Sequence, residues 1–199
     1  MDEADKVPRA QSYLEEYRHQ QQLPDALPVS LVSHVWSRSP LGRVKLNTDA
    51  GIDDEGVGLG VVVRNHDGNF ILAAAKRLKG INDPTLGEAL AIEFGFQLAR
   101  HHHLTMSVVE TDCLVVVNKL EVADEIQTEI GVVLRNIRRL AAMMGGSVHF
   151  ASRVANEAAH IMAHTKARWD ITGVWFDRPL LNLLDQLLKD NVASFSTGL

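Results

Sequence analysis

Val44–Asp49 (Val-Lys-Leu-Asn-Thr-Asp) is the stretch that decides the fold, because it alternates apolar and polar residues as a β-strand does and ends in a carboxylate. Pro84–Ala91 should start a helix that carries Glu88 in its opening turns. Met106–Asp112 should form a second strand that also ends in an acid. Three acids in the order strand, helix, strand predict carboxylates gathered at one edge of a sheet.

The segment between the first strand and the helix predicts an antiparallel meander. Gly58–Arg64 is rich in β-branched residues, and Asn69–Ala75 is a second apolar run. Asn65–Gly68 joins them and contains Asp-Gly, a strong hairpin signal. Asp83-Pro84 then supplies a cap and a first-turn proline for a helix that should end near His101.

The second half of the chain predicts alternating helices and strands. We expect a short helix at Leu114–Leu120, a long helix at Ile126–Met143, a last strand at Ser147–Phe150, and a helix capped by Asn156 that runs to about Ala167. Together with the meander, these elements predict an α/β fold with a mixed five-stranded sheet, three antiparallel strands and then two more, flanked by helices.

Three regions follow from this pattern. Residues 1–42 are polar and repeatedly broken by proline, so they should form an extension, with Trp36 as its anchor to the domain. Residues 43–168 should form the α/β domain. Residues 169–199 are rich in leucine and predict a C-terminal helical extension. Its helix is expected to pack on the domain; the alternative is contact with a protein partner or a second copy of the chain.

Composition limits the class of protein. The chain has 199 residues, of which 46% are hydrophobic, so one substantial domain with a packed core is expected. The net charge of −5 argues against a strongly basic coat for nucleic acid. Cys113 is the single cysteine, which excludes a disulfide framework and indicates a structural thiol. No run approaches the ~20 apolar residues of a membrane span, and the acidic N-terminus is unlike a signal peptide. A soluble, intracellular protein is expected.

The three acids indicate a divalent metal site. Asp49, Glu88 and Asp112 suit Mg²⁺, because this ion prefers carboxylate oxygens and keeps waters for a phosphate substrate. Asp49 is the best candidate to bridge two ions ~4 Å apart, an arrangement that supports in-line displacement at a phosphodiester. The alternative is that the three acids are exposed and have unrelated local roles, with Glu88 simply favouring a helix N-terminus.

The chain from Val44 to Lys166 resembles the type-1 ribonuclease H domain, in particular the reverse-transcriptase-like branch common in plants. The matching pieces are Lys45–Asp49, Gly58–Gly68, Gly87–Ala91, Val109–Asp112 and Arg153–His160. The resemblance implies an RNase H-like fold and a metal-dependent endonuclease that cleaves the RNA strand of an RNA–DNA hybrid. It also implies that Asp49, Glu88 and Asp112 are the first three catalytic, metal-binding acids.

The chain departs from the family at two positions. Asp49 is followed by Ala50-Gly51, whereas the family usually has Asp-Gly. His160 stands where the family commonly has an aspartate on the last helix. An imidazole can ligate there but suits Mn²⁺ better than Mg²⁺; Glu157 could reach in instead, or His160 is only a polar side chain at the sheet edge. We therefore expect reduced activity with Mg²⁺ and relative rescue by Mn²⁺.

Four arginines are candidates for contact with the nucleic acid. Arg135, Arg138 and Arg139 could form a phosphate-facing patch on the long helix, although such spacing is also that of an ordinary solvated face. Arg153, beside the last helix, could touch a scissile phosphate. An alternative function is a nucleic-acid-binding or protein-interaction domain of retroelement origin that keeps the fold but turns over little substrate.

Overall fold

The computed structural model describes residues 35–122, 128–165 and 173–196. Predictions for residues 1–34, including most of the N-terminal extension, lie outside this part. The described elements, in chain order, are β1 (Val44–Asp53), β2 (Gly56–Asn65), β3 (Phe70–Lys79), α2 (Pro84–His101), β4 (Met106–Thr111), α3 (Leu114–Glu121), α4 (Glu129–Met144), β5 (Ser147–Phe150), α5 (Arg153–Ala163), β6 (Gly173–Phe176) and α6 (Leu181–Ser196). None of these helices is long and apolar enough to cross a membrane.

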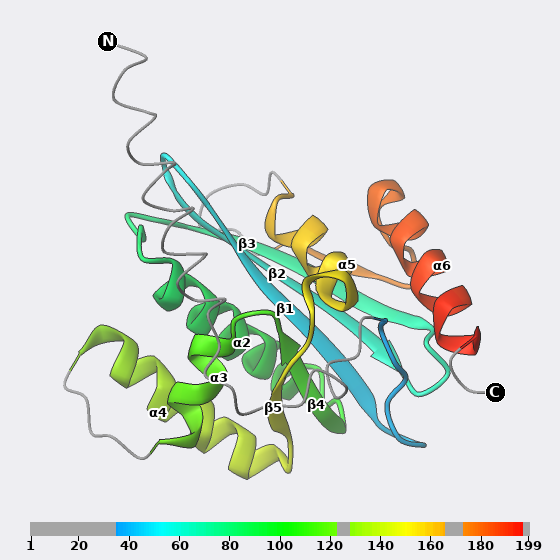
Figure 1. The fold of residues 1–199 in the computed structure, drawn as a ribbon, viewed down its shortest axis with the longest axis horizontal. Helices are drawn as coiled ribbons and strands as arrows, with labels where there is room; N and C mark the ends of the chain where they lie inside the picture. Colours follow the sequence, from blue (N-terminus) through cyan, green and yellow to red (C-terminus); the bar gives the residue numbers. More distant parts are fainter. Residues whose placement is uncertain (1–34, 123–127, 166–172, 197–199) are drawn as a thin grey trace, which may run out of the picture. The chain divides into compact units, whose positions relative to one another are not determined.

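β1 lies near the middle of one mixed sheet with the strand order β5-β4-β1-β2-β3-β6 (Figure 1). It pairs antiparallel with β2, which places Asp49 opposite Gly60. On its other side it pairs parallel with β4, which places Asn47 opposite Glu110. β2 and β3 complete the predicted meander across a turn in which Gly68 adopts a φ of 83°. The α/β architecture is therefore confirmed.

The sheet has six strands, so the prediction of five was wrong. β6 pairs antiparallel with β3, with Ala73 opposite Trp175. It belongs to the segment that we predicted to be helical. Four residues are too few to show a strand period, and the strand forms because the other edge of β3 offers backbone donors and acceptors. Within this segment the structure describes one helix, α6 (Leu181–Ser196).

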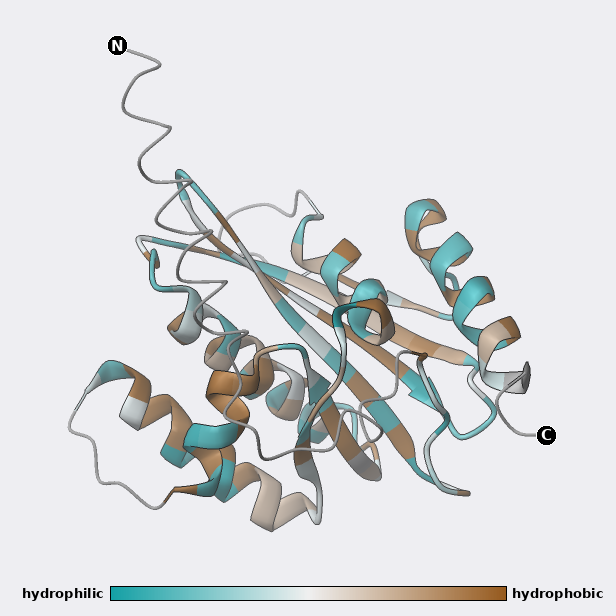
Figure 2. Cartoon of the chain, viewed as in Figure 1, coloured by the Kyte–Doolittle hydropathy of each residue, from teal (hydrophilic) through white to brown (hydrophobic). Residues whose placement is uncertain are grey.

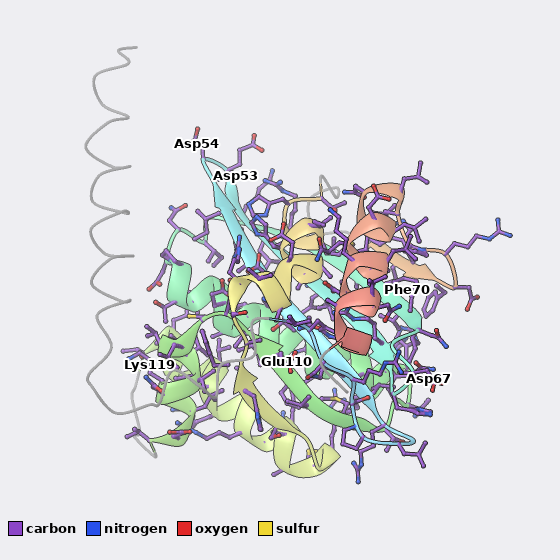
Figure 3. The ribbon with its side chains drawn as sticks, turned by 45° about the vertical axis from the view of Figure 1, so that its right-hand side comes forward. Asp53, Asp54, Asp67, Phe70, Glu110 and Lys119 are labelled. Atoms are coloured by element: carbon purple, nitrogen blue, oxygen red, sulfur yellow. The ribbon has the colours of Figure 1, made fainter. Side chains whose placement is uncertain are left out.

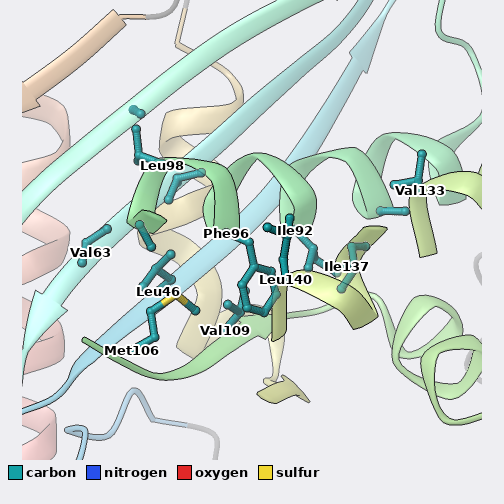
Figure 4. Close-up of a cluster of buried hydrophobic side chains, with 14 of the residues drawn as sticks. Leu46, Val63, Ile92, Phe96, Leu98, Met106, Val109, Val133, Ile137 and Leu140 are labelled. Carbon is teal, nitrogen blue, oxygen red and sulfur yellow. The ribbon is translucent and has the colours of Figure 1, made fainter. Parts of the chain in front are cut away.

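Helices cover both faces of the sheet (Figure 1). α2 and α4 pack on one face over the main hydrophobic cluster, which includes Leu46, Ile92, Phe96 and Ile137 (Figure 4). α5 and α6 cover the other face over a smaller cluster that includes Met162 and Leu183. Figure 2 shows hydrophobic and hydrophilic residues alternating along α4 and α6. Such two-sided burial explains why β2 is almost continuously apolar.

A buried polar cluster joins Trp36 and α6 to the sheet. Arg64 on β2 stacks 3.7 Å from the centre of the Trp36 ring and donates to Asp190 Oδ2 at 2.6 Å. Trp36 Nε1 and Arg64 Nη2 both donate to Asn47 Oδ1 at 3.0 Å. The predicted anchor role of Trp36 is therefore confirmed, and the Arg64–Asp190 ion pair fixes the C-terminal helix on the same face.

The start of α5 differs from the prediction. Ser152, and not Asn156, is the N-cap, since its side chain accepts from the backbone N–H of Ala155. The helix ends at Ala163, short of the predicted Ala167. Asn156 is a residue within the helix and is fully buried, and its side-chain amide donates to the carbonyl oxygen of Thr48 on β1.

Two glycines on β2 let α5 lie directly on the sheet. A Cβ at Gly60 would sit 2.2 Å from the backbone nitrogen of Ala163 and 2.5 Å from the carbonyl oxygen of Ala159. A Cβ at Gly58 would sit 2.2 Å from the carbonyl oxygen of Ala163. Because these are backbone atoms, no side-chain rotation could make room, and the helix would have to move away.

We predict that Gly60→Ala lowers the free energy of unfolding by about 3 kcal/mol, the upper end of the range for overpacking. Gly146→Ala is the matched control, because a Cβ there would meet the flexible methyl of Met106 at 3.3 Å. Denaturant unfolding of both variants measures the difference. A Gly60→Ala protein as stable as the control would show that α5 does not pack this closely.

Candidate metal centre

The pleat of β1 decides which side chains face α5. Thr48 lies on the α2 side, where its Cγ2 is 2.9 Å from the position of a Cβ at Gly95. Asn47, Asp49 and Gly51 therefore lie on the face of the strand that meets α5, since alternate residues of a strand share a face. The side chain of Asp49 is completely buried there.

The structure brings the three predicted acids together from three separate elements. Asp49 comes from β1, Glu88 from the second turn of α2, and Asp112 from the residue after β4. One carboxylate oxygen of each lies within 4.8 Å of one oxygen of each of the others. Two other acids, Asp53 and Asp54, lie apart from this group at the tip of the β1–β2 hairpin (Figure 3).

Burial makes Glu88 and Asp49 hard to ionise, and for Glu88 the charges of the neighbouring acids add to this effect. Loss of water around Glu88, and then the charges of Asp49 and Asp112, raise its pKa well above the ordinary value. Burial also raises the pKa of Asp49, although the hydrogen bond from His160 opposes this effect. A divalent cation would balance the charge, and its preferred ligands are carboxylate oxygens. The residues present therefore fit a Mg²⁺-type site.

Two neutral side chains orient the acids. Thr111 Oγ1 donates to Glu88 Oε2 at 3.4 Å. Asn156 Nδ2 donates to Asp112 Oδ1 at 3.2 Å and to the carbonyl oxygen of Thr48 at 2.9 Å, while its own oxygen accepts from Asn47 Nδ2. Sequence reasoning missed this role, because it interpreted Asn156 as a helix cap. The signal was its spacing of four residues from His160, which puts both on one face of α5.

Arg153 lies within the site. Its Nη1 donates to Asp49 Oδ1 at 3.1 Å and to Asp112 Oδ2 at 2.7 Å, and its Nη2 contacts His160 Nδ1. The guanidinium therefore places a positive charge between two of the three acids. Its side chain is 44% exposed, so it has room to turn outward.

His160 contacts the buried acid directly. Its Nδ1 lies 3.0 Å from Asp49 Oδ2. His164, one turn later, was missed by sequence reasoning; its ring centroid is 4.0 Å from that of His160. One ligand atom each of Asp49, His160 and His164 lies within 4.8 Å of the other two, and Glu157 is not part of this group.

The remaining candidates lie elsewhere. Arg138 donates to the carbonyl oxygens of Leu120, Lys119 and Val122, so its guanidinium holds the end of α3. Arg135 and Arg139 are exposed on α4. Burial raises the pKa of the Cys113 thiol to about 12, which makes it a poor nucleophile and agrees with a structural role.

Comparisons with known proteins identify the fold and the family. The fold is similar to that of RNase H1 from the halophilic archaeon Halobacterium salinarum, with a TM-score of 0.55 and 18% identity over 61% of this chain and 95% of that chain. It is also similar to the N-terminal RNase H domain of a Mycobacterium tuberculosis protein, with a TM-score of 0.54 and 19% identity over 61% of this chain and 90% of that one.

A third structure, LC11-RNase H1 in complex with an RNA/DNA hybrid, has a TM-score of 0.53 and 14% identity over 60% of this chain and 93% of that one. None of the curated proteins matches the chain. The model of the reverse transcriptase-like family matches residues 47–166, which span β1 to α5 and contain every acid of the metal centre. The protein therefore belongs to the reverse transcriptase-like family and has an RNase H-like fold.

Proposed function

We propose that the protein is a divalent-metal-dependent endonuclease that cleaves the RNA strand of RNA–DNA hybrids. The convergence of Asp49, Glu88 and Asp112 within 4.8 Å carries this proposal. The RNase H-like fold supports it, and so does the hybrid bound to the LC11 neighbour.

The acids have distinct roles in this proposal. Asp49, Glu88 and Asp112 would hold one divalent ion, and Asp49 and His160 would hold a second. When bound, the ions supply an activated water and charge stabilisation for in-line displacement at the phosphodiester. Asn156 and Thr111 act as positioning residues, because their hydrogen bonds hold Asp112 and Glu88 in place.

Arginines can supply local positive charge for a polyanion on a chain whose net charge is −5. Arg153 is the residue best placed for a scissile phosphate, since it already contacts two of the acids and is partly exposed. Arg135 and Arg139 are exposed and remain candidates for backbone contacts, whereas Arg138 is the weakest because three carbonyl oxygens occupy its guanidinium. Discrimination of RNA from DNA is expected to rest on 2′-hydroxyls in the minor groove.

A second candidate function is a nucleic-acid-binding domain with little turnover. The observation that favours it is Arg153, which neutralises Asp49 and Asp112 without a metal ion. His160 at the fourth acidic position favours it too. Both functions require nucleic-acid binding, but only the nuclease cleaves the bound hybrid.

Asp49→Asn is therefore expected to lower the rate of cleavage of a labelled RNA–DNA hybrid about a thousandfold or more. A thousandfold loss corresponds to ~4 kcal/mol of transition-state stabilisation. Hybrid binding should persist. Asp54→Asn is the matched control, because this exposed acid at the hairpin tip is outside the site. Absence of cleavage by the wild type, together with intact binding, would select the second function.

The choice of metal tests the role of His160. We expect the wild type to cleave slowly with Mg²⁺ and faster with Mn²⁺, because imidazole is a poor ligand for Mg²⁺. His160→Asp should raise the Mg²⁺ rate and reduce the ratio of the two rates. Equal high rates of the wild type in both metals would contradict a weakened second ion position.

The charge of Glu88 should make stability depend on pH. Since its pKa is raised in the folded protein, the folded state binds more protons than the unfolded state, and stability falls as pH rises from the ordinary to the raised pKa. In EDTA at about pH 8, Glu88→Gln should therefore unfold at a higher temperature than the wild type, because the amide places no charge beside Asp49 and Asp112. At about pH 4 most of the advantage should disappear, because Glu88 is then largely protonated in both states.

Glu93→Gln on the same helix is the control, since Glu93 accepts a hydrogen bond from Asn136 and is not one of the acids of the site. Thermal unfolding of the three proteins across this pH range measures the effect. An advantage of Glu88→Gln that does not change with pH would show that charge is not its cause.

A further inference from the structure

We propose that Asp49, His160 and His164 form a binding site for a first-row transition-metal ion of the Mn²⁺, Co²⁺ or Zn²⁺ type. His164 is the new ligand, and it turns the position of the weakened second ion into a two-histidine, one-carboxylate site. The role of this ion in cleavage rests on the proposed function, but its binding does not.

The spacing of the two histidines supports a shared ion. His160 and His164 are four residues apart, and His164 is the C-cap of α5, so the two rings lie on the same side of the helix axis, one turn from each other. One ligand atom from each histidine and one oxygen of Asp49 lie within 4.8 Å of one another. A tetrahedral ion with bonds of ~2.1 Å holds its ligand atoms ~3.4 Å apart. Small side-chain rotations are therefore enough to enclose an ion.

A hydrogen bond fixes which nitrogen of His164 is available. His164 Nδ1 lies 3.0 Å from the carbonyl oxygen of His160. A carbonyl oxygen can only accept, so Nδ1 carries the proton and donates it. The lone pair of the ring is then on Nε2. Metal-binding histidines are commonly held in this way, with the nitrogen that does not ligate donating to a carbonyl oxygen.

The space for the imidazole of His164 comes from Gly51. A Cβ at Gly51 would lie 2.8 Å from His164 Cε1 and 3.0 Å from His164 Nε2. Any larger residue would push the ring away from the strand and from Asp49, two residues earlier. The displaced glycine in Ala50-Gly51 thus has a physical role here: it lets His164 lie against β1.

The chemistry of the three ligands selects the class of ion. Two imidazoles and one carboxylate suit Mn²⁺, Co²⁺ and Zn²⁺, whereas Mg²⁺ prefers oxygen ligands. Arg153 is the group that an ion must displace, because its guanidinium contacts both Asp49 and His160. Its partial exposure gives it a route to solvent.

The test is equilibrium binding of Co²⁺ to the untagged 199-residue chain, measured by the visible absorption of the bound ion and by the metal content after dialysis. His164→Gln is expected to weaken Co²⁺ binding at least about tenfold, the scale on which even the hydrogen-bond partners of ligands matter. Its Mg²⁺ affinity should be unchanged. His101→Gln is the control, because it removes an exposed histidine from the other histidine-rich part of the chain, His101–His103.

Each outcome decides the proposal. Wild-type affinity and spectrum in both His164→Gln and His164→Asn would overturn it, as would an equal loss in His101→Gln. Thermal unfolding of these variants checks that they are folded. If the His164 variants lose Co²⁺ binding and the wild type cleaves no hybrid, the result would support this site and reject the nuclease. If the wild type cleaves the hybrid and its Co²⁺ affinity does not depend on His164, the result would support the nuclease and reject this site.

Discussion

The close packing of α5 against β1 and β2 is the constraint on which the rest of the site depends. Alternate residues of β1 meet successive turns of the helix: Asn47 bonds to Asn156, Asp49 to His160, and Gly51 lies under His164. This match is possible only because Gly58 and Gly60 leave no side chain between strand and helix. The same packing removes Asp49 from water and delivers Arg153, Asn156 and both histidines to it.

Burial of several acids at one point has an energetic consequence. Folding pushes Glu88 and Asp49 toward protonation, and Arg153 offsets part of the negative charge. A site of this kind stores an unfavourable charge arrangement that a divalent cation relieves, so ion binding and folding stability are linked. The buried Arg64–Asp190 pair and the two hydrophobic clusters provide the rigid surroundings that hold the acids together.

Much of the fold could be predicted from local signals. The alternation in Val44–Asp49, the Asp-Gly turn and the Asp83 cap each act over a few residues, and the corresponding elements appear where they were expected. The convergence of the three acids followed from the rule that strand ends meet at one edge. β6 could not be predicted in this way, because its formation depends on an open edge of β3 that is distant in the sequence.

The finer parts of the site also depended on tertiary contacts. Asn156 has the residue type of a cap, but the nearby Ser152 takes that role and leaves Asn156 for Asp112. Arg138 looks like a phosphate ligand until α3 brings three carbonyl oxygens to it. His164 becomes relevant only because Gly51 admits its ring. Each of these roles is decided by what lies opposite in space.

The central claim is that the three converging carboxylates, of which Asp49 is fully buried, hold a cation for phosphodiester cleavage. Anomalous scattering from a crystal grown with Mn²⁺ and an RNA–DNA hybrid tests it most directly. We predict a metal peak bonded to Asp49, Glu88 and Asp112, with the guanidinium of Arg153 turned away from Asp49. A map with no metal at these acids, and with Arg153 still bridging Asp49 and Asp112, would contradict the claim.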